Sequence, residues 1–233
     1  MSEDIARRIL ALERRMAHLE ALEGAGFLSS IWTGRLSALN VMRGMRDDFW
    51  GDLISPVWAA AVVGTGVFAA LQTDSPSRVL LDTGGTTGGV SVLNEGGFLH
   101  WAFADKMTIV ARIRLNSAAA IDARIGLEQS ATDMVFVGCD AAVSANFLLR
   151  TRAAGVNTNA PTTTPIDTNW HIVSLSITSS LVKARIDGGD EVQSITNIPA
   201  GNSQLVARIE NQANASKTLQ VDYILAIPDV AAF

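Results

Sequence analysis

The chain has 233 residues, of which 48% are hydrophobic, 18% are charged and 6% are aromatic. This composition is typical of one globular domain with an extension, and the length is too short for several domains. The 18 lysines and arginines stand against 23 aspartates and glutamates, a formal net charge of -5, so a nucleic acid is not an expected partner. The single cysteine, Cys139, excludes an internal disulfide and a zinc site built from several cysteines.

The first 23 residues carry the clearest periodic signal in the chain. Apolar side chains recur at alternating spacings of four and three residues, which is typical of the seam of a coiled coil. These seam residues are Ile5, Ile9, Leu12, Met16 and Leu19. In that heptad register Arg8 and Arg15 occupy position g, while Glu13 and Glu20 occupy position e. Each arginine can therefore pair with the glutamate five residues further on in a parallel neighbour.

Residues 8–13 and 15–20 both resemble the short trimerisation motif of coiled coils, which has arginine at g, apolar residues at a and d, and glutamate at e. The resemblance implies a coiled coil of three parallel helices, because the arginine stem packs over the seam while its guanidinium reaches the glutamate. Residues 1–23 are therefore expected to form a parallel trimeric coiled coil, and the protein is expected to be a homotrimer. The alternative is one amphipathic helix packed on its own domain, which leaves the repeated pairs of arginine and glutamate unexplained.

A helical connector is expected over residues 24–56. Gly24 and Gly26 interrupt the first helix, and apolar residues between positions 29 and 53 return mainly at helical spacing. Trp32, Trp50 and Trp58 lie in or just beyond this segment. For these rings, packing beneath the next domain is favoured over docking to a larger assembly.

From residue 57 onward the hydrophobic pattern alternates, as expected for half-buried strands. The candidate strands are residues 79–81, 90–93, 108–115, 124–128, 134–138, 146–151, 171–178, 181–187, 204–209 and 218–227. The apolar stretch 57–71 is shorter than the roughly 20 residues that cross a bilayer, so buried strands are expected there instead of membrane insertion. Many short strands with Gly-rich turns predict a mainly β domain over residues 57–233, an antiparallel β-sandwich or jelly roll.

Three segments near the C-terminus carry a resemblance to a known fold. Trp170 and His171 lead into a strand, residues 182–188 form a strand that ends in Asp-Gly, and residues 221–224 place Asp-Tyr in a closing strand. This order resembles the concanavalin A-like lectin and glucanase jelly roll. The resemblance extends over residues 57–233 and implies a concanavalin A-like sandwich after the N-terminal α-helical coiled coil. It informs the fold more than the activity, because this architecture serves many functions.

The residues that catalysis would need are largely missing. Glucanases of this architecture carry a Glu-x-Asp-x-Glu run on one strand, because a nucleophile and an acid must face the same cleft, and this sequence has no such run. Asp187, Asp190 and Glu191 cluster in a Gly-rich turn, and a solvated turn explains them better than a calcium site does. We therefore predict no catalytic residue, no metal and no cofactor. Cys139 is expected to be a small buried filler.

Three residues are candidates for ligand binding: Trp101, Trp170 and His171. Aromatic rings stack on sugar faces, although a histidine on a strand is more often a hydrogen-bonded structural residue than a catalytic one. Residues 157–165 are rich in asparagine, threonine and proline, which favours an exposed loop. Sugar contact is the alternative to plain solvation for that loop.

These features together favour a non-enzymatic structural protein of a phage virion, either a fibre or a capsid-decorating component. The expected layout is a trimeric coil for attachment to other virion proteins and a jelly-roll head. The alternative is a carbohydrate-binding, lectin-like module that takes a host-surface glycan as its partner. A glycan-degrading enzyme is the least favoured function, because the carboxylate run is missing.

Overall fold

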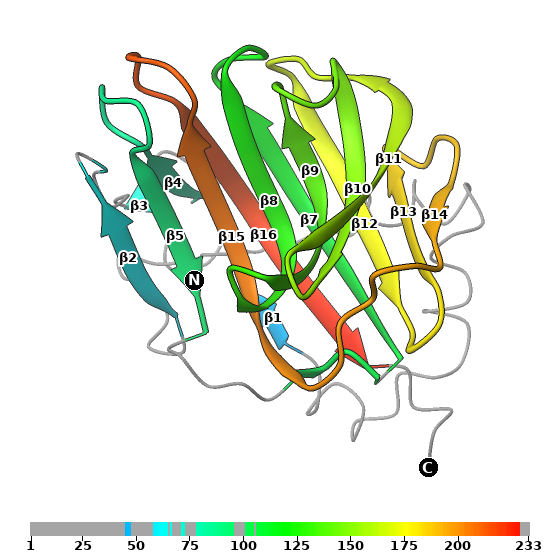
Figure 1. The fold of residues 1–233 in the computed structure, drawn as a ribbon. Coiled ribbons are helices and arrows are strands. Elements are labelled where there is room, and N and C mark those ends of the chain that lie inside the picture. Colours follow the sequence, from blue (N-terminus) through cyan, green and yellow to red (C-terminus); the bar gives the residue numbers. More distant parts are fainter. Residues whose placement is uncertain are drawn as a thin grey trace, which may run out of the picture. The chain divides into compact units, whose positions relative to one another are not determined.

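The computed structural model describes residues 45–47, 58–64, 66, 71–72, 78–95, 101–104 and 106–228 (Figure 1). The chain divides into two compact units, Met1–Arg43 and Gly44–Phe233, and all described residues belong to the second unit. The predicted coiled coil over residues 1–23, with its seam and its charged pairs, lies outside the described residues. Most of the predicted helical connector lies outside them as well.

Every regular element among the described residues is a strand, and the strands form two antiparallel sheets. Sheet A has the order β14 (Val192–Ser194), β13 (Val182–Ile186), β12 (Trp170–Ile177), β7 (Met107–Leu115), β16 (Thr218–Pro228), β4 (Arg78–Asp82) and β3 (Leu71–Gln72). Sheet B has the order β11 (Val156–Pro165), β10 (Asn146–Ala153), β9 (Asp133–Asp140), β8 (Ile121–Ser130), β15 (Asn202–Asn211), β5 (Val90–Asn94) and β2 (Ala59–Val63). Two short strands add to these paths: β1 (Met45–Asp47) pairs with β16, and β6 (Trp101–Ala102) pairs with β15.

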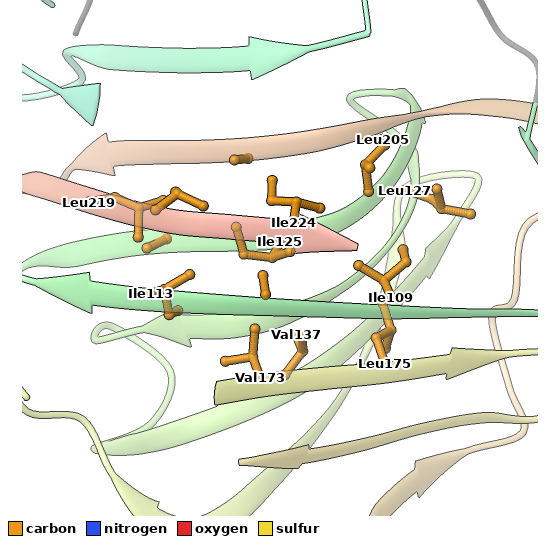
Figure 2. Packing of buried hydrophobic residues seen from close by; sticks show 14 of the residues in the cluster. Ile109, Ile113, Ile125, Leu127, Val137, Val173, Leu175, Leu205, Leu219 and Ile224 are labelled. Atoms are coloured by element: carbon orange, nitrogen blue, oxygen red, sulfur yellow. The ribbon is translucent and has the colours of Figure 1, made fainter. Parts of the chain in front are cut away.

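The hydrophobic core lies between the two sheets, because alternate residues of each strand point to the same side. Ile109 and Ile113 of β7 and Val173 of β12 enter the core from sheet A, and Ile125 of β8 and Val137 of β9 enter it from sheet B (Figure 2). Burying one such side chain contributes about 1.5–3 kcal/mol. We call the side of each sheet that turns away from this core its outer face.

All ten strands predicted from alternation are present, with boundaries shifted by a few residues. The predicted Asp-Gly turn is also confirmed: Asp187 and Gly188 have φ of 52° and 69°, and the amide of Gly189 donates to the carbonyl of Ile186 at 2.8 Å. Two positive φ angles in succession are the type I′ turn that joins tightly paired strands. The sequence therefore predicts both the mainly β class and the antiparallel arrangement.

The polar run 157–165 is strand, and its prediction as a loop is wrong. It forms most of β11 at the end of sheet B, where it pairs with β10 on one side. Threonine favours a pleated backbone, and proline is tolerated in a strand at the edge of a sheet, where one side needs no hydrogen-bond donor. The pairing of β10 with β11 is irregular at one place. Leu148 of β10 lies opposite Pro161 of β11, whereas Asn146 lies opposite Pro165, so the register shifts between them.

Two further predictions are corrected in part. Met45–Asp47, inside the predicted helical connector, form a strand, because β4 pairs only with Thr218–Val221 of β16 and leaves Ile224–Ala226 for β1. In the stretch 57–71, which was expected to form buried strands, β2 is a strand but its last four residues are exposed. The exposure of β2 follows from its position at the end of sheet B.

Candidate functional site

Trp101 of β6 is a buried residue, with 7% of its surface exposed. Its indole N–H donates a hydrogen bond to the carboxylate of Glu95, which is itself buried, and the same Glu95 oxygen accepts from the amide of Leu205 at 3.0 Å. A buried carboxylate requires such donors, because an unpaired charge in the core is costly. The ring of Trp101 offers no face to a ligand, so its position does not support the predicted role in binding.

Trp170 lies on the outer face of sheet A, directly opposite Arg114 of β7. The guanidinium of Arg112 lies 4.6 Å from the centroid of its ring, and the same guanidinium donates to the buried carboxylate of Asp222 at 2.9 Å. A cation over an aromatic face is attracted by the electron density of the ring. Arg112 therefore fixes Trp170 against the sheet, and the ring remains partly exposed.

His171 follows Trp170 directly and points the other way, toward the core. Its Nδ1 lies 2.6 Å from the carboxylate of Asp187, and its Nε2 lies 2.8 Å from the carboxylate of Asp167. The ring is buried and meets the ring of Phe147 edge to face, with centroids 4.9 Å apart. We call His171, Asp167 and Asp187 the histidine clasp, because the three side chains join a loop, a strand and a turn.

The charges of the histidine clasp favour the protonated imidazole. The hydrogen bond that His171 donates to Asp187 raises the pKa of His171, burial opposes this shift, and the bond to Asp167 adds to it. For Asp167, burial alone would raise the pKa of the carboxyl, but the hydrogen bonds from Asn169 and His171 outweigh it and lower that pKa. A catalytic base needs a free ring nitrogen within reach of a substrate. Both nitrogens of His171 are held by carboxylates, so the clasp is suited to holding the fold together.

The fold thus separates the three candidate ligand residues. Trp101 is buried beside β15, Trp170 lies on the outer face of sheet A, and His171 faces the core. Trp170 and His171 are neighbours in sequence, but successive residues of a strand point to opposite sides of the sheet. Only Trp170 is placed where a ligand could reach it.

The outer face of sheet B holds a second apolar cluster that the sequence analysis did not identify. Met134 and Phe136 of β9 and Leu148 of β10 are all buried, although they point away from the main core. The guanidinium groups of Arg124 and Arg150 lie 5.1 and 5.2 Å from the centroid of the Phe136 ring. A guanidinium over the face of an aromatic ring is attracted to the electron density of that ring. The uninterrupted apolar character of residues 134–137 is the signal that could have revealed it.

Beside this cluster the sheet brings two aspartates together. Asp122 of β8 and Asp140 of β9 are directly opposite each other in the register, and Glu210 of β15 is the next carboxylate in the row. Residues opposite each other in an antiparallel pair have Cβ atoms about 4.5–5.5 Å apart. This pair of carboxylates could not be found by searching for acidic residues along one strand, because its members come from different strands.

Each carboxylate of this row is bound by its own arginine. Arg124 donates to both oxygens of Asp122, at 2.8 and 2.6 Å. Arg150 donates to Asp140 at 2.7 Å, between two buried side chains, and Arg208 donates to Glu210 at 3.0 Å. Bidentate pairs between arginine and carboxylate are among the stronger hydrogen bonds in proteins. The acidic row is therefore neutralised by a row of arginines.

The protonation of Asp140 follows from these contacts. Burial would raise the pKa of its carboxyl, but hydrogen bonds from Gln212 and Arg150 outweigh burial and lower that pKa. A general acid in a glycosidase needs the opposite shift, since its carboxyl must carry a proton near neutral pH. Asp140 is held as a carboxylate and cannot supply that proton.

Other expected features can be compared with the described residues. Cys139 is fully buried, as predicted, and burial raises the pKa of its thiol to about 12. Asp187 and Glu191 are not merely solvated, because Asp187 binds His171 and Glu191 pairs with Lys183 at 2.8 Å.

Within the described ranges, no group of three or more His, Cys, Asp and Glu residues could hold a metal ion. The same part of the chain contains no helix long and apolar enough to cross a membrane.

Comparison with known proteins shows the fold. No family model matches the chain, and no curated protein matches it. A β-1,3-glucanase from Mycobacterium marinum has a TM-score of 0.56 at 12% identity, over 78% of this chain and 97% of that one. A protein of unknown function from Shewanella oneidensis MR-1 has a TM-score of 0.60 at 12% identity, over 82% and 87%. The binding domain of botulinum neurotoxin DC, solved in complex with rat synaptotagmin II, has a TM-score of 0.51 at 11% identity, over 73% and 43%.

These similarities are limited to the arrangement of the chain. At such low identity they establish only a mainly β protein built from two antiparallel sheets. One of the similar proteins is named as a glucanase and another as the binding domain of a toxin, so the shared fold does not indicate one function. The fold is therefore a two-sheeted antiparallel β-sandwich of the kind found in a glucanase and in a toxin binding domain.

Proposed function

We propose that the chain is a non-enzymatic, trimeric structural protein of a phage particle, a fibre or capsid-decorating component with a concanavalin A-like jelly-roll head. The observation that carries the non-enzymatic part is the neutralised acidic row on sheet B. Asp122 and Asp140 stand opposite each other, and each is bound by an arginine. The heptads of residues 1–23 carry the trimeric part.

The acidic row argues against glycan hydrolysis for a chemical reason. A retaining glycosidase uses two carboxyl groups about 5 Å apart, one as nucleophile and one as a protonated acid. Asp122 and Asp140 are the pair that the sheet register places opposite each other on neighbouring strands. However, Arg124 and Arg150 each form an ion pair with one member, and the contacts of Asp140 hold that residue as a carboxylate. A sandwich similar to that of a glucanase can thus serve as a rigid head without its chemistry.

The structural role is tested on particles of the phage that encodes the chain. Mass spectrometry of purified particles, with the major capsid protein as an internal standard, measures how many copies each particle contains. The proposal predicts a constant copy number that is a multiple of three, because the protein attaches as a trimer. Absence from purified particles contradicts the proposal. A copy number that is not a multiple of three contradicts the trimer.

A carbohydrate-binding head is the second candidate, and Trp170 is the observation that favours it. Its ring is partly exposed on the outer face of sheet A and is held in place by Arg112. A fixed ring is suited to stacking on a sugar. Binding to host-surface glycans that is lost in Trp170→Ala, while Val143→Ala binds normally, supports this function. Equal binding by both variants, or no binding by the unaltered protein, rules it out.

A further inference from the structure

The exposed apolar side chains of the head lie mainly at the two ends of the sandwich. Among the described residues, the large hydrophobic side chains that are exposed are Val62, Val63, Val143, Val156 and Ile195. Val62 and Val63 belong to β2 at one end of sheet B (Figure 1). Val156 begins β11 at the other end of the same sheet. Only Val143, in the connection between β9 and β10, belongs to neither end.

Ile195 belongs to the same end as Val156. It follows β14 directly, and the next residue, Thr196, shares a hydrogen bond of 2.9 Å with Thr158 of β11. Asn197 also donates to Thr158, at 2.9 Å. These bonds fasten the segment after β14 to the first half of β11. We call β2 the first edge, and Val156 with Ile195 the second edge.

The first edge lacks the features that protect an exposed strand. Natural edge strands carry lysine, proline or a bulge, which prevent uncontrolled pairing with other chains. The sequence of β2 is Ala-Ala-Ala-Val-Val, and no charged residue occurs from Val57 to Thr73. Its register with β5 runs without a bulge from Ala59 to Val63. Among the described residues, β5 is the only strand that pairs with it. An edge of this kind is expected to be covered in the assembled protein.

We propose that, in the trimer, the first edge of each head packs against the second edge of the next copy, so that three heads close into a ring. This inference rests on the proposed trimer. Threefold symmetry requires each copy to offer two different surfaces that meet head to tail. The apolar residues at opposite ends of the sandwich meet this requirement, whereas one self-complementary patch would favour a twofold dimer. In this arrangement the coiled coil of residues 1–23 joins the three copies, and the contacts between first and second edges join their heads.

The experiment measures the dissociation of the full-length trimer by analytical ultracentrifugation. Val63→Lys places a charge on the first edge, where Val63 is 61% exposed, and Ile195→Lys does the same on the second edge, where Ile195 is 72% exposed. Because each lysine would be desolvated in the ring, each variant is expected to raise the dissociation constant of the trimer by about tenfold or more. Val143→Lys is the matched control: this valine is 48% exposed and belongs to neither edge, so no change is expected.

A second variant pair tests whether the two edges meet each other. Val63→Lys combined with Ile195→Glu places opposite charges across the proposed contact, so the double variant should recover a large part of the affinity that each single variant loses. Circular dichroism and thermal unfolding confirm that all variants fold. If the single variants dissociate no more readily than Val143→Lys, or if the double variant regains no affinity, the proposed contact between the heads is refuted. The proposed trimer itself is not contradicted by either result. An unaltered chain that stays monomeric refutes the proposed trimer itself.

Discussion

Replacing His171 with glutamine removes the positive charge between the two carboxylates of the histidine clasp. The imidazole is bound by Asp187 and Asp167 and packs against Phe147. Hydrogen bonds to charged groups contribute about 1.5–3 kcal/mol each. The side chains of Asp167 and Asp187 are 37% and 45% exposed, so solvent screening places both bonds at the lower end of that range. We expect His171→Gln to lower the free energy of unfolding by about 2–3 kcal/mol in mildly acidic solution.

The stabilisation by His171 decreases as the pH rises, because it depends on the protonated imidazole. The pKa of His171 is raised in the folded protein above its ordinary value of 6.5, chiefly by the hydrogen bond that the imidazole donates to Asp187. The stabilisation is therefore fully present below about pH 6.5 and is lost as the pH rises through the folded pKa. In that window the folded state holds the proton more tightly than the unfolded state, so the stability of the unaltered protein falls as the pH rises.

The assay is urea unfolding followed by tryptophan fluorescence, at a series of pH values from about 5 to about 9. When the free energy of unfolding is plotted against pH, the curve of the unaltered protein should approach that of His171→Gln as the pH rises. His18→Gln serves as the control, because it removes a histidine from the predicted coil and leaves the clasp intact. Curves for the unaltered protein and His171→Gln that stay parallel over the whole range would refute a charged His171 in the fold.

Further predictions concern the buried charge, the core and the coil. Arg150→Ala leaves Asp140 without its arginine and should lower the free energy of unfolding by about 3 kcal/mol, measured by urea unfolding; a loss below about 1 kcal/mol contradicts a buried ion pair. Trp101→Phe removes the donor to Glu95 and should cost about 1–3 kcal/mol in the same assay, whereas an unchanged midpoint contradicts that bond. Leu12→Asp places a charge on the predicted seam and should weaken the trimer in light scattering. A mass that stays trimeric shows that the heads drive assembly.

The regular part of the fold was predictable because it depends on local patterns. Strands such as β7 and β12 are buried on one face, so apolar and polar residues alternate along them. The turn at Asp187 and Gly188 was predictable because few residues tolerate two positive φ angles in succession. In each case the information lies within a few residues of the chain.

The features that could not be predicted depend on contacts between distant segments. The polar β11 is a strand because β10 lies beside it, and β1 is a strand because β4 leaves part of β16 unpaired. For the site, Asp122 and Asp140 become neighbours only through the register of β8 and β9. Trp101 is a candidate for binding in the sequence because its pairing with Ser203 of the distant strand β15 cannot be read from the residues around it.

The most direct test of the central claim is binding of the full-length protein to two targets measured side by side: phage particles stripped of the protein, and the intact host surface. A structural component of the particle is predicted to bind stripped particles at saturable sites and to leave the host surface unbound. Binding to the host surface alone contradicts that claim and identifies the jelly-roll head as a receptor-binding module, with Trp170 as the first residue to alter.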